Sequence, residues 1–253
     1  MSGALLEAVQ VVARAAGTVA LSHYRTSLAV EAKADGSPVT VADRAAERLA
    51  REWIAERFPA DGILGEEFGP TDGASGRRWL LDPIDGTKSF VRGVPLWGTL
   101  VAVVRGDEVL AGAAFFPAVD EIVAAAPGEG CWWNGRRTRV SDVSSLAQAT
   151  VLTTDDRTFA DPAHARGWRR LVEDSGIARG WGDCFGYLLL ATGRAEVMVD
   201  AVMNPWDAAC FLPIVEEAGG RFTDLAARRT AFGGSVVATN AALATVVRSY
   251  FGA

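Results

Sequence analysis

The chain has 253 residues, of which 49% are apolar, so it can bury one large core or two small ones. Its formal net charge of −6 argues against a nucleic-acid-binding surface, which is normally basic. Two histidines and three widely spaced cysteines argue against a zinc centre, a histidine-based triad and a disulfide framework, and they favour buried thiols in a reducing compartment such as the cytoplasm.

The first predicted element is a helix over residues 3–24. This segment is rich in Ala, Val and Leu, but Glu7, Gln10 and Arg14 interrupt it, and no basic stretch precedes it. We interpret it as an amphipathic helix and not as a signal peptide or a membrane span, so no membrane partner is expected.

A polar loop is expected at 33–38, followed by a helix over 41–57. Thr40 is typical of an N-cap residue, and Asp43 three positions later resembles the acidic partner of a capping box. This pattern places the start of the second helix at residue 41.

Strands and helices then arrive in blocks, which favours an α/β protein built of stacked helix and sheet layers. After these two helices, the rest of the first half is predicted to form strands at 62–66, 78–82, 97–104, 108–116 and 121–126, then a hairpin over 131–140 that turns at Asn134-Gly135. In the second half we predict strands at 149–154, 195–199, 220–223 and 235–239, and helices at 162–175, 183–192, 207–218 and 240–250.

The most informative stretch, residues 79–90, reads Trp-Leu-Leu-Asp-Pro-Ile-Asp-Gly-Thr-Lys-Ser-Phe. An apolar strand leads directly into Asp82 and Asp85, with Pro83 fixing the backbone between them. Gly86 and Thr87 follow, where a helix can begin. Carboxylate oxygens suit Mg²⁺, and the free N–H groups of a helix start suit a phosphate. This arrangement indicates metal-assisted phosphoryl chemistry.

A lone Asp-x-x-Asp is more often a turn or a solvated helix face, so the interpretation depends on further acids. Glu66 and Glu67 follow another apolar strand, and Asp207 stands at the start of an apolar helix. Three acidic clusters at the ends of separate elements are what a two-metal site requires.

These motifs together resemble those of the inositol monophosphatase family, whose members are Mg²⁺-dependent, lithium-sensitive phosphatases. The matching segments, in family order, are Pro-Val-Thr-x-x-Asp at 38–43, Gly-Glu-Glu at 65–67, Asp-Pro-Ile-Asp-Gly-Thr at 82–87, Trp-Asp at 206–207 and Ala-Gly-Gly at 218–220. The resemblance covers about residues 5 to 250. It implies a single domain over 1–253 with an αβαβα sandwich fold, its halves at about 1–145 and 146–253, and a homodimer.

The resemblance also implies a ligand set for two or three Mg²⁺ ions. Two ions would share one carboxylate. The first would be held by Glu66, Asp82 and the carbonyl of Ile84, and the second by Asp82, Asp85 and Asp207.

The remaining catalytic roles are likewise implied by the family. Thr87 and Glu66 would orient the attacking water, and the N–H groups of Gly86 and Thr87 would receive the phosphate. Asp43 would hold Thr87, although it could serve only its own helix terminus. The roles of Glu67 and Arg92 stay open.

Substrate choice depends on groups around the leaving alcohol, and two acids are predicted to bind it, Asp183 and Asp200. Gly-Asp-x-x-Gly-Tyr at 182–187 and the segment 90–97 resemble the histidinol-phosphate phosphatase branch of the family, and a carboxylate pair suits a cationic substrate. Asp183 could instead be only an N-cap. The alternatives are an inositol-1-phosphatase, a broader phosphatase of sugar or nucleotide phosphates, or a binding protein for RNA or the transcription machinery.

Overall fold

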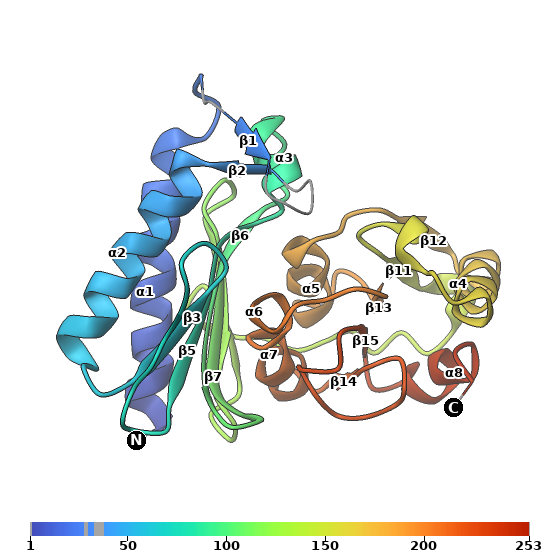
Figure 1. Ribbon diagram of the computed structural model, residues 1–253. Helices are drawn as coiled ribbons and strands as arrows, with labels where there is room; N and C mark the ends of the chain where they lie inside the picture. The colour runs from blue at the N-terminus through green and yellow to red at the C-terminus, as the bar shows by residue number, and fades with distance from the viewer. Residues whose placement is uncertain (1, 28–29, 33–37, 253) are drawn as a thin grey trace.

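Two β-sheets of unequal size lie in the two halves of the chain (Figure 1). The structure is a computed structural model that describes residues 2–27, 30–32 and 38–252. The larger sheet has the strand order β10-β9-β8-β7-β6-β5-β3-β4, and the smaller has the order β12-β11-β13-β15-β14. Among the described strands, only β3 with β5, and β11 with both β12 and β13, pair in parallel.

The larger sheet is built from β3 (Gly62–Gly65), β4 (Gly69–Thr71), β5 (Arg78–Asp85), β6 (Gly98–Arg105), β7 (Glu108–Phe116), β8 (Glu121–Ala125), β9 (Cys131–Trp133) and β10 (Arg136–Arg137). The smaller is built from β11 (Thr150–Leu152), β12 (Ile177–Arg179), β13 (Val197–Asp200), β14 (Arg221–Thr223) and β15 (Val236–Thr239). A separate short pair joins β1 (Val30–Ala32) to β2 (Pro38–Thr40).

Helices cover the faces of both sheets. They are α1 (Ser2–His23), α2 (Val41–Arg57), α3 (Thr87–Val91), α4 (Pro162–Asp174), α5 (Cys184–Ala191), α6 (Pro205–Ala208), α7 (Phe211–Glu217) and α8 (Ala244–Ser249). Two 3₁₀ turns lie at Leu146–Gln148 and Asp156–Thr158.

The layers stack as helices, sheet, helices, sheet, helices (Figure 1). Helices α1 and α2 pack on the outer face of the larger sheet, α5 and α7 lie between the sheets, and α4 and α8 cover the far face of the smaller sheet. Along β6 the side chains alternate between two cores: Val101 and Val103 face α1, whereas Leu100 and Ala102 face the middle layer. The predicted αβαβα sandwich is confirmed.

The middle core includes side chains from both halves of the chain, such as Leu100 and Val104 of the larger sheet with Met198 and Val236 of the smaller one. This shared core supports our proposal that residues 1–253 form a single domain, divided near residue 145 into two halves.

Helix α1 matches the helix predicted for residues 3–24. By length and composition its residues Gly3–His23 could cross a membrane, despite the polar residues that interrupt them. Half of an 18-residue stretch within this segment is buried in the protein, and Val9, Val12 and Ala16 pack into the core against the larger sheet. The helix is therefore a core element of the fold.

Local patterns located most elements. Strands β1, β2, β4 and β12 were not predicted, since each has three residues and little periodicity. The single helix predicted for 207–218 is wrong, because Pro213 has no N–H to bond the carbonyl of Ala209, and the chain breaks into α6 and α7. The last helix begins at Ala244 and not at 240. Residues 33–37 of the expected polar loop lie outside the described residues.

Candidate metal centre

The metal motif depends on an irregularity in β5. In a regular strand, residues three apart point to opposite faces of the sheet. Asp82 pairs with Leu100 and Asp85 with Gly98, so β5 advances three residues while β6 advances two. This bulge, which accommodates Pro83, turns both carboxylates toward the same side.

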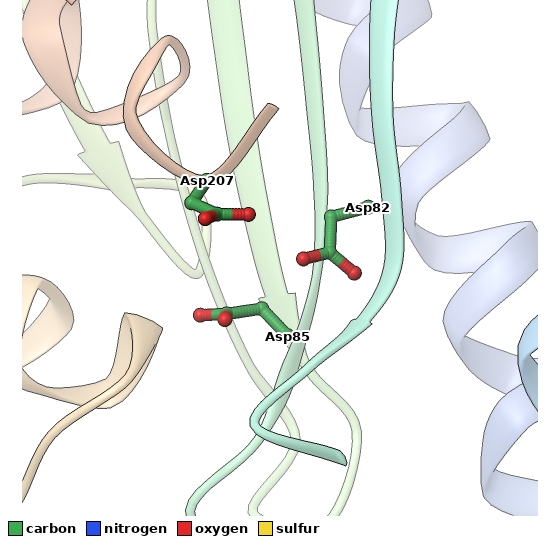
Figure 2. Close-up of side chains that lie close together, drawn as sticks. All are labelled: Asp82, Asp85 and Asp207. Carbon is green, nitrogen blue, oxygen red and sulfur yellow. The ribbon is translucent and has the colours of Figure 1, made fainter. Parts of the chain in front are cut away.

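Asp207 reaches the same place from the other half of the chain. It lies in α6, where its carboxylate accepts hydrogen bonds from the backbone N–H and the side-chain amide of Asn204, at 3.0 and 3.1 Å. Asp82, Asp85 and Asp207 each contribute a carboxylate oxygen to a group whose members all lie within 4.8 Å of one another. Figure 2 shows the three side chains converging from β5 and α6.

The electrostatics of this cluster favour a cation. Burial raises the pKa of Asp82, and the negative charges of Glu66 and Asp85 raise it further. Burial raises the pKa of Asp207 to about 6, with a further contribution from Glu66. Four carboxylates that repel one another in a buried site are a donor set of hard oxygens, which fits Mg²⁺.

The segment after the bulge turns sharply around Gly86. Its φ of +88° is in the left-handed region, and a Cβ there would lie 2.7 Å from the carbonyl oxygen of Leu96 and 3.2 Å from Oδ2 of Asp183. Thr87 begins α3, and its hydroxyl donates to the carbonyl of Ile84 at 3.0 Å. Three of the predicted ligands and both predicted phosphate-binding residues therefore lie on one stretch of chain, from Asp82 to Thr87.

Asp43 forms the predicted capping box. Its Oδ2 accepts from the N–H and the hydroxyl of Thr40, at 2.8 and 2.7 Å, and its side chain is buried. Burial raises the pKa of Asp43, and the charge of Glu66 adds to this effect, so the side chain lies close to the acidic cluster. Its role in holding Thr87 stays a prediction.

Asp183 lies at the edge of the acidic cluster, directly before α5. Burial raises the pKa of Asp85, and the charge of Asp183 raises it further; the pKa of Asp183 itself is raised to about 6 by burial and by the charge of Asp200. It makes no capping hydrogen bond with its side chain, although it occupies the N-cap position. Its backbone, at φ +49° and ψ −153°, is in a region that costs a non-glycine residue about 1–3 kcal/mol.

A cavity of about 590 Å³ opens beside Asp183. Charged and aromatic side chains line it, including Lys88, Asp155, Arg157, Trp168, Arg179 and Asp183. Asp200 is 3% exposed, and its two oxygens accept from the N–H of Thr154 and the hydroxyl of Tyr187, each at 2.8 Å. The two predicted substrate residues thus differ: Asp183 borders the cavity, whereas Asp200 is buried and does not line it.

Comparison with known proteins identifies the family. The family model described as the inositol monophosphatase family matches residues 4–250. This chain belongs to the inositol monophosphatase family. It is 44% identical over 232 residues to a protein of Chlorobaculum parvum named histidinol-phosphatase, covering 90% of each chain. It is 37% identical over 221 residues to a histidinol-phosphatase of Mycobacterium tuberculosis, covering 85% of each.

Among solved structures, the extragenic suppressor protein suhB from Bartonella henselae is similar over 98% of both chains, with a TM-score of 0.92 and 25% identity. The resemblance drawn from the motifs, including that to the histidinol-phosphatase branch, is therefore confirmed. The comparisons support the fold and the family together.

This inositol monophosphatase family member also has a buried acid that the sequence analysis missed. Glu47 is one turn after Asp43 on α2, and its carboxylate accepts from the backbone N–H groups of Glu67 and Phe68, at 2.8 and 3.3 Å. Arg51 pairs with it at 2.7 Å. These contacts fix the backbone directly after Glu66, so Glu47 helps to position this predicted ligand.

We expect Glu47→Gln to weaken Mg²⁺ binding about 10- to 100-fold, the usual effect of losing a group that orients a metal ligand. Titrating Mg²⁺ against phosphatase activity and against the unfolding temperature measures this change. Glu56→Gln is the matched control, because Glu56 lies on the same helix with its side chain 73% exposed. An unchanged Mg²⁺ titration in Glu47→Gln would show that the turn after Glu66 needs no such support.

Proposed function

We propose that this protein is a Mg²⁺-dependent phosphomonoester hydrolase that acts on histidinol phosphate. The observation that carries the proposal is the convergence of Asp82, Asp85 and Asp207 from distant parts of the chain, with Glu66 beside them. The relatives named histidinol-phosphatase support the choice of substrate. Release of inorganic phosphate from histidinol phosphate in the presence of Mg²⁺ is the direct test.

In this proposal the ligands are divided as the family resemblance implies. Glu66, Asp82 and the carbonyl of Ile84 would hold one Mg²⁺, and Asp82, Asp85 and Asp207 would hold another. When bound, Mg²⁺ lowers the pKa of a coordinated water and neutralises charge on the phosphoryl oxygens. Two or three ions per site remain part of the proposal.

The chain's own residues would do the rest. Glu66 accepts a hydrogen bond from the attacking water, and the Thr87 hydroxyl helps to orient it in line with the ester bond. Gly86 and Thr87 bind the phosphate through their N–H groups, because the first turn of a helix leaves such groups without intrahelical partners. Asp43 would hold Thr87 in position.

The leaving alcohol would occupy the cavity next to Asp183. Histidinol carries an amine and an imidazole, both of which can be cationic. Asp183 places a carboxylate along this cavity, whereas the carboxylate of Asp155 is paired with Arg157, and a carboxylate such as that of Asp183 binds a cationic alcohol better than a neutral polyol. Substrate choice therefore depends on this wall and not on the metal ligands.

Asp183→Asn should lower kcat/KM for histidinol phosphate about 10- to 100-fold. A hydrogen bond to a charged group is worth about 1.5–3 kcal/mol, at about 1.4 kcal/mol per tenfold change in rate. Hydrolysis of glycerol 2-phosphate, which has no cationic group, should change far less. Steady-state kinetics on both substrates measure the difference.

Asp107→Asn is the control for this prediction, because Asp107 is an exposed carboxylate that does not line this cavity. Equal losses on both substrates would mean that Asp183 maintains the fold of the site instead of recognising the alcohol.

Further properties in this proposal come from the family resemblance: a homodimer, sensitivity to lithium, and a cytoplasmic location. The three cysteines are buried and unpaired, which agrees with a reducing compartment. Hydrolysis of inositol 1-phosphate is the competing activity, since inositol-1-monophosphatases are also relatives, for example one of Rhizobium meliloti at 32% identity. A non-catalytic role in binding RNA is less favoured, because binding alone does not require a cluster of four carboxylates.

A further inference from the structure

We infer that Asp200 and Thr154 form a positioning relay, which holds the unfavourable backbone of Asp183 and so fixes its carboxylate at the substrate cavity. This inference deepens the proposed function and rests on it, because it concerns how the site recognises its leaving alcohol. In this relay Asp200 acts through Thr154 and does not touch the substrate.

The first step is that Asp183 is tied on both sides. Its own N–H donates to Oγ1 of Thr154 at 2.8 Å. The next N–H, that of Cys184, donates to Oδ2 of Asp85 at 2.5 Å. A positive φ at a non-glycine residue persists only where the surroundings determine it. These two hydrogen bonds define the orientation of both peptide planes that flank Asp183.

The second step is the close packing of the preceding residue. A Cβ on Gly182 would lie 2.2 Å from Cα of Thr154 and 2.8 Å from its Oγ1. The backbone at 182 therefore lies directly against Thr154, and any shift of Thr154 moves the segment that carries Asp183. Position 182 therefore requires glycine, because any side chain there would collide with the backbone of Thr154.

The third step is that Thr154 is itself held from inside the protein. Its N–H donates to Oδ1 of Asp200, while the hydroxyl of Tyr187 donates to Oδ2. Asp200 ends β13 and is 3% exposed, and Tyr187 is fully buried in α5. Within the described residues, Asp200 is not part of the wall of the cavity next to Asp183. Its carboxylate is hydrogen-bonded to Thr153, Thr154 and Tyr187.

The relay predicts a loss of selectivity when the Thr154 hydroxyl is removed. Thr154→Val keeps the shape and the N–H that Asp200 accepts, but it removes the acceptor for the N–H of Asp183. We expect the ratio of kcat/KM for histidinol phosphate to that for glycerol 2-phosphate to fall about 2- to 10-fold, the effect of one neutral hydrogen bond. Thr154→Ser retains a hydroxyl and should preserve the ratio.

A double-mutant cycle separates positioning from general damage. If the relay acts through the Asp183 carboxylate, Thr154→Val should cause no further loss of selectivity in an Asp183→Asn background. Losses that multiply would overturn the inference, because they would show that Thr154 influences selectivity independently of Asp183.

Hydrogen exchange tests the relay without reference to any substrate. Thr154→Val and Asp200→Asn should each speed amide exchange in a peptide spanning 181–185, and Thr154→Ser should not. Unchanged exchange in both variants would overturn the relay. If the wild-type protein hydrolyses other esters but not histidinol phosphate, the proposed substrate fails, and the exchange result alone then decides whether the relay exists.

Discussion

Replacing Asp85 with asparagine should reduce kcat/KM by about two orders of magnitude or more, and excess Mg²⁺ should restore only part of it. Asp85 is held in place by the N–H of Cys184, which an asparagine oxygen can still accept, so the fold should survive. The variant loses one unit of negative charge from a cluster in which one carboxylate oxygen of each residue lies within 4.8 Å of the others. An ion held by several carboxylates depends strongly on each of them.

Thermal unfolding gives a second readout for the same variant. Mg²⁺ at 100 times its dissociation constant stabilises the folded wild type by about 2.7 kcal/mol. For a chain of this size that raises the unfolding temperature by about 2–4 °C per kcal/mol. Asp85→Asn should lose most of this shift. Without Mg²⁺ the variant should be at least as stable as the wild type, because one repulsive carboxylate has been removed.

Asp72→Asn is the matched control for both measurements, because its side chain is 99% exposed and lies outside the acidic cluster. If Asp85→Asn hydrolyses substrate at close to the parent rate and keeps the Mg²⁺ shift, Asp85 is not a metal ligand.

The second large effect is expected at Thr87. Thr87→Ala should lower kcat about 100-fold or more, the usual cost of losing one hydrogen bond that acts in the transition state. KM should change little, because a hydrogen bond to the attacking water contributes little to binding the substrate in the ground state. Thr87→Ser keeps the hydroxyl and should retain most of the activity.

The kinetic constants distinguish two roles for this residue. The hydroxyl of Thr87 donates to the carbonyl of Ile84, so it also steadies a predicted ligand. A rise in KM with kcat preserved would make Thr87 a substrate-binding residue, and a change confined to the Mg²⁺ titration would make it a support for Ile84.

Features set by neighbouring residues were predictable from the sequence. The capping box of Thr40 and Asp43 is confirmed, as is the hairpin turn at Asn134-Gly135, where both residues have positive φ. The acids gathered at the metal site were found because Glu66, Asp82 and Asp85 follow apolar runs that end abruptly and Asp207 stands at the start of an apolar helix. That they converge was inferred from chemistry, since no local pattern places Asp207 beside Asp82.

Features that depend on pairing between distant segments were not predictable. The bulge between Asp82 and Asp85 is visible only in the register with β6, although Pro83 is compatible with it. The burial of Glu47 depends on β3 passing beneath α2. Only its position four residues after Asp43, on the same helix face, could have indicated a role. The hydrogen bonds of Asp200 likewise join separate elements, since its partners are Thr154 in a loop 46 residues away and Tyr187 in a helix 13 residues away.

The central claim is tested most directly by measuring phosphate release from the purified protein. Substrates would be histidinol phosphate, inositol 1-phosphate, fructose 1,6-bisphosphate and a 3′,5′-bisphosphonucleoside, each with Mg²⁺ and with the metal removed by a chelator. We predict the highest kcat/KM for histidinol phosphate and no activity on any of them without the metal. No phosphate release from any ester in the presence of Mg²⁺ would contradict the account, and a preference for inositol 1-phosphate would contradict its choice of substrate.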